Sequence, residues 1–112
     1  MRDPHLTAAW RSMADRIDLP FDDFLILVNG WDVHRVDVKG APVGAIFVNG
    51  PEIHACIDCS YRGLWMSKKT LRVLSEVIRK HGYATTAATT PEGAQFVERL
   101  GFVFDGQKYV LR

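Results

Sequence analysis

The sequence has little net charge, few cysteines and no long apolar run. Its 14 lysines and arginines are almost matched by 13 aspartates and glutamates, which gives no electrostatic reason to bind nucleic acid or an anionic membrane. No apolar run approaches the roughly 20 residues that span a bilayer. The first five residues, MRDPH, contain no apolar stretch typical of a signal peptide. We therefore expect a cytoplasmic protein that binds neither nucleic acid nor membrane.

The only two cysteines, Cys56 and Cys59, form a single C-x-x-C pattern. A zinc site would need two further ligands at a suitable spacing, and the chain has no second C-x-x-C and no H-x-x-x-H. A redox motif of the thioredoxin type would open a helix, whereas these cysteines lie near the end of an expected strand. We therefore expect no metal site, and small, partly buried strand residues at these positions.

What the sequence does contain fits one packed α/β (α+β) domain covering residues 1–112. Hydrophobic residues make up 47% of the 112 positions, and their spacing alternates between helical and strand periods. The expected helices cover residues 4–17, 21–28, 66–81 and 91–100, and the expected strands cover residues 33–38, 43–48, 52–59, 83–88, 102–104 and 108–111. The predicted order is α-α-β-β-β-α-β-α-β-β, with a mixed, mostly antiparallel central sheet flanked by helices.

The segment IDCSYRGLWMS, residues 57–67, is the most informative part of the chain. It combines the end of a strand, a short turn and the expected start of a long amphipathic helix. Free amides of a first helical turn, together with the helix dipole, favour bound anions. We therefore expect the amides between Arg62 and Ser67 to hold a phosphate group.

Two motifs, in this order of elements, resemble the GNAT (N-acetyltransferase) superfamily over roughly residues 33–112. Residues 57–67 are similar to the family's strand followed by R/Q-x-x-G-x-G/A, and the segment AQFVERLGF, residues 94–102, is similar to its late helix ending in L-G-F. The two leading helices then occupy the position where the family binds its acceptor.

This resemblance implies an acyl-CoA-dependent N-acetyltransferase with acetyl-CoA as cosubstrate. An amine of a small molecule or a protein would attack the acetyl thioester directly. The strand before the turn would splay from its neighbour, so that backbone near Ile57 pairs with the pantetheine arm. The implied cosubstrate-binding residues are Ile57, Asp58, Cys59, Arg62, Gly63, Leu64, Trp65, Met66 and Ser67.

The resemblance also implies a general base on the third strand. Alternation of side chains puts Glu52 and His54 on one face of this strand, together with Cys56 and Asp58. We expect Glu52 as the first candidate base and His54 as the second. The same pattern equally fits a polar, solvent-facing side of an antiparallel sheet, and both interpretations stay open.

The chain departs from the family at three positions. Trp65 stands where the family usually has glycine, and its indole either crowds the phosphate or points into the core and leaves the amides free. Val97 stands where a tyrosine often protonates the departing thiolate, and Thr90 where an asparagine is common.

These departures support a second hypothesis. Small, divergent GNAT-like proteins of bacteriophages, including internal virion proteins of short-tailed phages, have a similar degenerate pattern. The chain would then be a catalytically inactive structural or interaction protein, located in a host cytoplasm or a virion. The sequence leaves two kinds of protein partner open: a second copy of this chain in a homodimer, or other proteins of a virion assembly.

Overall fold

The computed structural model describes residues 3–14, 16–61 and 63–112. It is a mixed α/β structure in which helices and strands follow one another in the predicted order. The helices are α1 (Pro4–Ala14), α2 (Phe21–Leu27), α3 (Lys68–His81) and α4 (Pro91–Arg99), and the strands are β1 (Asp32–Val38), β2 (Ala41–Asn49), β3 (Glu52–Ile57), β4 (Ala84–Thr86), β5 (Val103–Phe104) and β6 (Tyr109–Leu111). None of the described helices is long and apolar enough to cross a bilayer.

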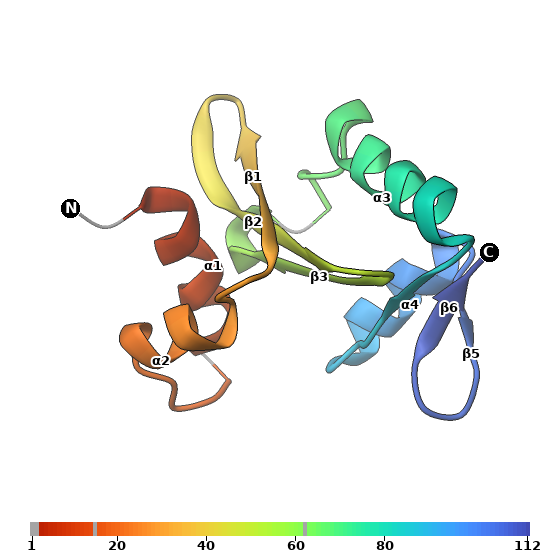
Figure 1. Cartoon of the computed structure of the whole chain (residues 1–112). Helices are drawn as coiled ribbons and strands as arrows, with labels where there is room; N and C mark the ends of the chain where they lie inside the picture. The colour runs from red at the N-terminus through yellow and green to blue at the C-terminus, as the bar shows by residue number, and fades with distance from the viewer. Residues whose placement is uncertain (1–2, 15, 62) are drawn as a thin grey trace.

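The six strands form one sheet in the order β1-β2-β3-β4-β6-β5 (Figure 1). Strands β1 to β3 form the predicted antiparallel meander, and β5 and β6 form the predicted hairpin. The parallel pair is β3 with β4, as the intervening helix α3 requires. The sheet is therefore mostly antiparallel, as expected from the sequence.

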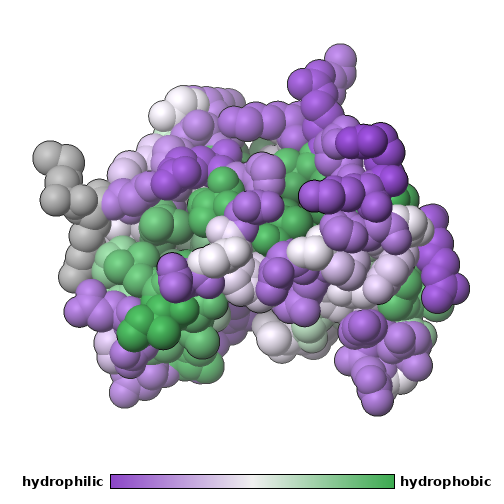
Figure 2. Space-filling model, viewed as in Figure 1, coloured by the Kyte–Doolittle hydropathy of each residue, from purple (hydrophilic) through white to green (hydrophobic). Residues whose placement is uncertain are grey.

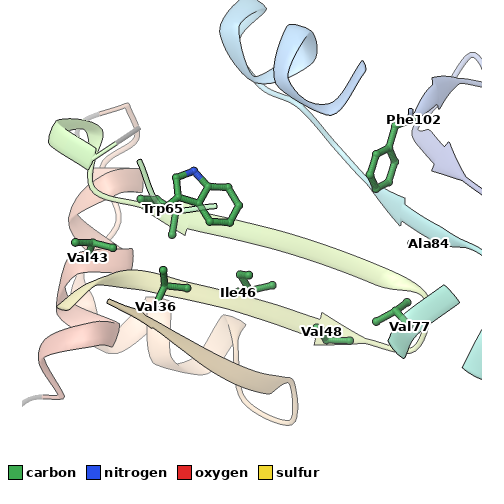
Figure 3. Packing of buried hydrophobic residues seen from close by; sticks show 9 residues of the cluster. Val36, Val43, Ile46, Val48, Trp65, Val77, Ala84 and Phe102 are labelled. Carbon is green, nitrogen blue, oxygen red and sulfur yellow. The ribbon is translucent and has the colours of Figure 1, made fainter. Parts of the chain in front are cut away.

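Alternate residues of β2 send their side chains to opposite faces of the sheet. On one face, Phe47 packs against Phe24 of α2 with ring centroids 5.8 Å apart, beneath helices α1 and α2. On the other face, Ile46 belongs to a cluster with Val77 of α3 and Phe102. Figure 3 shows Trp65 at one end of this second cluster, and Val77, Ala84 and Phe102 at the other.

The start of α3 differs from the prediction. The helix begins at Lys68 rather than at residue 66, because Ser67 and Thr70 form a capping box. The Ser67 amide donates to Thr70 Oγ1 (2.7 Å), and the Thr70 amide donates to Ser67 Oγ (3.3 Å). Strand β3 is also shorter than predicted, since Cys59 begins a 3₁₀ turn that ends at Tyr61.

Several large apolar side chains remain exposed. Figure 2 shows hydrophobic surface where α2 lies in Figure 1. On that helix Ile26 is 72% exposed and Leu27 is 59% exposed. Val103 and Phe104 of the edge strand β5 are exposed as well.

Candidate functional site

Strands β3 and β4 meet at one end and then part. Strand β2 pairs with β3 along its whole length, from Glu52 to Ile57. On the opposite edge of β3, the register pair that the described residues make with β4 is Glu52 with Thr85. The Thr85 amide donates to the Pro51 carbonyl oxygen (2.7 Å) and fixes this vertex. The two strands therefore splay apart, as the resemblance implies, and most of one edge of β3 has no described strand beside it.

A cleft of about 440 Å³ opens between the diverging segments. From β3 it is lined by Ala55 and Ile57, and from the turn before α3 by Gly63 and Trp65. The opposite wall consists of residues 86–90, which begin at the last residue of β4, and of residues along α4 from Glu92 to Arg99. The volume lies within the range of pockets that hold small ligands. The cleft is the strongest candidate for a binding site in the part of the chain that the structure describes.

Charged groups stand at the rim of the cleft. Arg16, which follows α1, and Arg99 of α4 both line it, together with the carboxylate of Glu92. The guanidinium of Arg16 donates from Nη1 to Thr89 Oγ1 (2.7 Å), which connects the segment after α1 to the wall formed by residues 86–90. Arg16 thus offers a cation to an anionic ligand.

Only some of the backbone amides between Arg62 and Ser67, the predicted phosphate-binding segment, are free to bind a phosphate. Two of these amides are already used: Leu64 donates to the Tyr61 carbonyl oxygen (3.0 Å), and Ser67 donates to Thr70 Oγ1 (2.7 Å). The segment precedes α3 instead of forming its first turn, which corrects the sequence-based expectation. Arg62, the first residue of the predicted phosphate-binding segment, lies outside the described residues.

Trp65 points into the core. Its side chain is 8% exposed, and its ring lies 5.5 Å from the ring of Phe96. Of the two orientations considered from the sequence, the structure therefore has the inward one. The indole also lines the cleft, so a ligand there would rest against it.

Glu52 and His54, the two candidate bases, lie next to each other, but neither residue lines the cleft. Glu52 Oε2 and His54 Nε2 are 2.7 Å apart, and the imidazole lies 5.6 Å from the ring of Trp31. Glu52 is the residue at which β3 and β4 part. The pair is thus beside the vertex of the cleft, not among its described lining residues.

The face that carries Glu52 and His54 is not a purely polar, solvent-facing one. Cys56 on that face packs into the cluster beneath α1 and α2. Burial raises the pKa of the Cys56 thiol to about 11, against a smaller opposing effect of the Arg16 charge. The thiol is therefore neutral near pH 7 and unsuited to act as a nucleophile.

The remaining predicted residues are dispersed around the turn. The Asp58 amide donates to the Val43 carbonyl oxygen (2.8 Å), and the Asp58 carboxylate accepts from the Ser60 amide (2.9 Å). Cys59 and Leu64 are exposed, whereas Met66 lines a separate apolar cavity. No group of three His, Cys, Asp or Glu side chains suited to a metal ion occurs within the described ranges.

Several lining residues could not be predicted from any local sequence pattern. Ser12, Arg16 and the run of alanines and threonines at residues 86–90 enter the cleft only through the tertiary fold. The sole hint was Thr90, which caps α4 by accepting from the Gly93 amide (3.0 Å).

Comparisons of the chain with protein-family models, with curated proteins and with solved structures found no match. The resemblance to the GNAT superfamily therefore rests on the motifs and on the element order alone.

Proposed function

We propose that this chain is an acyl-CoA-dependent N-acetyltransferase that binds its thioester cosubstrate between β3 and β4. The observation that carries the proposal is the unpaired edge of β3 beside a cleft of about 440 Å³. The amide groups of a pantetheine arm can pair with that edge in the manner of an added strand. An unpaired strand edge can pair with the edge of another chain and cause aggregation. A ligand bound along β3 would also cover this edge.

The phosphates would lie at the open end of the cleft, beside Gly63 and the start of α3. Since the amides of Leu64 and Ser67 are engaged, fewer donors remain for a diphosphate. Each missing charge-assisted hydrogen bond removes about 1.5–3 kcal/mol. We therefore expect a dissociation constant for acetyl-CoA of about 1 mM. The positive charges of Arg16 and Arg99, which line the cleft, act against this loss of affinity.

The reaction is a direct transfer of the acetyl group. The neutral amine attacks the thioester carbonyl carbon, the C–N bond forms, and the C–S bond breaks. Coenzyme A leaves as a thiolate, which takes up a proton equivalent to the one that the amine loses. The hydrogen-bonded pair of Glu52 and His54, beside the point where β3 and β4 part, is the candidate base for that proton.

Thermal melting with and without acetyl-CoA tests the proposal. Ligand at ten times Kd adds about 1.4 kcal/mol to the free energy of unfolding. For a domain of this size, Tm then rises by about 5 °C. An Ala87→Trp variant fills the cleft and should lose the rise, whereas Gln107→Trp, in the exposed β5–β6 turn, should keep it. The proposal fails if about 10 mM acetyl-CoA leaves Tm unchanged.

A second candidate function is that of a catalytically inactive structural or interaction protein on the same fold, as in a bacteriophage virion. The observation that favours it is the exposed apolar surface of α2, where Ile26 and Leu27 face solvent. Under this hypothesis acetyl-CoA gives no thermal shift and the chain self-associates at about 100 µM. An Ile26→Asp variant should then be monomeric in light-scattering measurements.

A further inference from the structure

A second, apolar cavity adjoins the cleft. It has a volume of about 70 Å³ and lies between β2, β3, α3 and α4. The two spaces share the lining residues Ala55, Trp65, Thr86, Phe96 and Val97. A ligand seated along β3 therefore has the apolar cavity directly beside it.

The cavity offers almost nothing to a water molecule. Its described lining contains no charged side chain, and its hydroxyl groups are those of Thr70 and Thr86. The Thr70 hydroxyl is already engaged by the cap of α3, where it accepts from the Ser67 amide (2.7 Å) and lies 2.9 Å from the Ser67 carbonyl oxygen. A buried water needs about two to four polar partners, so apolar spaces of this kind stay dry and accept apolar ligands.

The boundary between the cleft and the apolar cavity is formed by both bulky and small side chains. Trp65 and Phe96 form a bulky part of it, with ring centroids 5.5 Å apart. Ala55 forms a small part: it is the exposed residue opposite Ile46 in the β2–β3 ladder, and its methyl group leaves the adjoining space open. A narrow, flexible chain fits past Ala55 more readily than a ring does.

From this juxtaposition we propose that the apolar cavity receives the acyl chain of the thioester, so that the preferred cosubstrate carries a medium-length acyl group rather than acetyl. The inference rests on the proposed function. The space of about 70 Å³ exceeds the roughly 10–15 Å³ that admits one water molecule, so it has room for a short apolar chain. A hexanoyl chain is the length chosen for the test, and its tail would lie between Val73 and Leu74 of α3 and Ile53 of β3.

The experiment measures binding and turnover with a series of acyl-CoA thioesters. Each buried methylene tightens binding roughly fourfold, and incomplete burial lowers this factor. We expect hexanoyl-CoA to bind about 10- to 100-fold more tightly than acetyl-CoA. Decanoyl-CoA should gain less than about threefold beyond hexanoyl-CoA, because the cavity is then full.

Substitutions on α3 localise the effect. Val73 lines the apolar cavity but not the cleft, so Val73→Phe should remove the advantage of hexanoyl-CoA and leave the affinity for acetyl-CoA within about threefold. Leu71→Phe adds the same ring on the exposed part of the helix and should keep the advantage. Should Val73→Phe fail to fold, the chain-length series on the unmodified protein decides alone.

The outcomes separate the two proposals. Equal or weaker binding of hexanoyl-CoA than of acetyl-CoA overturns the acyl-cavity inference, while the N-acyltransferase proposal stands. Absence of binding for every thioester in the series overturns both.

Discussion

Arg16 and Thr89, which are 73 residues apart in the chain, are joined across the cleft by a hydrogen bond of 2.7 Å from Nη1 to Oγ1. Arg16 follows α1, on the face of the sheet that carries Phe47, whereas Thr89 belongs to the segment that diverges from β3. The bond therefore connects the helical layer with the far wall of the candidate site. Because both residues are exposed, the bond contributes little to the stability of the fold.

The charge of Arg16, rather than this hydrogen bond, should matter for binding. We expect Arg16→Ala to weaken acetyl-CoA binding by about 3- to 10-fold, since a cation at the rim of the cleft is lost. Thr89→Val removes the hydrogen bond but keeps the charge, and should change Kd by less than about twofold. Isothermal titration calorimetry measures both values. Arg11→Ala, on α1 away from the cleft, is the matched control, and an equal effect of all three variants would refute the role of Arg16.

Glu52→Gln tests the candidate base. The substitution keeps the size of the side chain and removes its basicity, so turnover near pH 7 should fall by about 10²- to 10⁴-fold while acetyl-CoA binding is retained. His54→Gln should have a smaller effect, since its imidazole is the hydrogen-bond partner of Glu52. Glu76→Gln, on the exposed side of α3, is the control. Unchanged turnover in Glu52→Gln would remove this residue from the mechanism.

Gly44→Ala should destabilise the sheet beside the cleft. Gly44 has φ +152°, and an added Cβ would lie 2.1 Å from the Cys56 carbonyl oxygen of the paired strand. Strand β2 would have to move away from β3, and we expect a loss of about 2–4 kcal/mol in the free energy of unfolding. Gly40→Ala also has a positive φ but meets no atom within 4 Å, so it should lose only about 1 kcal/mol. Equal losses in urea-unfolding measurements would contradict the close approach.

Asp3 should make the fold sensitive to acid. The hydrogen bond from Arg35 lowers the pKa of the Asp3 carboxyl below its usual range, and the amides of Leu6 and His5 act in the same direction. A lowered folded-state pKa gives stability that is present above about pH 4 and is lost as the pH falls through the folded value. We expect Asp3→Ala to lose about 1–2 kcal/mol at pH 7, through the helix cap and the ion pair.

This difference should become smaller as the pH falls through the folded-state pKa of Asp3, because the protonated carboxyl no longer forms the ion pair with Arg35. Denaturant unfolding at pH 7 and at a series of lower pH values measures it. Asp105→Ala, whose carboxylate caps the exposed β5–β6 turn, is a comparison without an ion pair to a strand. A difference for Asp3→Ala that stays constant with pH would rule out the proposed electrostatic cause.

The order and type of the elements could be predicted because each carries its own periodic signal. In α3, in the cap of α1 by Asp3 and in the turn capped by Asp105, the structure depends on residues that are close together in the sequence. The start of α3 was predicted two residues too early, because the reciprocal bonds of Ser67 and Thr70 outweigh the apolar character of Met66.

The site was less predictable because it is made by tertiary contacts. The splay at Ile57 followed from the resemblance, but the wall formed by residues 86–90 has no distinctive composition. The inward position of Trp65 depends on Phe96, 31 positions later in the chain, which no local pattern connects to it. Arg16 likewise reaches the cleft only because α1 packs on β2 and β3.

We propose that a thioester of coenzyme A binds along the open edge of β3. The most direct test is a titration of the ¹⁵N-labelled protein with acetyl-CoA, followed by amide chemical shifts. We expect the largest changes at Ala55, Ile57 and Thr89 and at the indole of Trp65, with little change on α2. Shifts confined to α2 or to the β5–β6 hairpin, or no shifts at about 10 mM ligand, would contradict it.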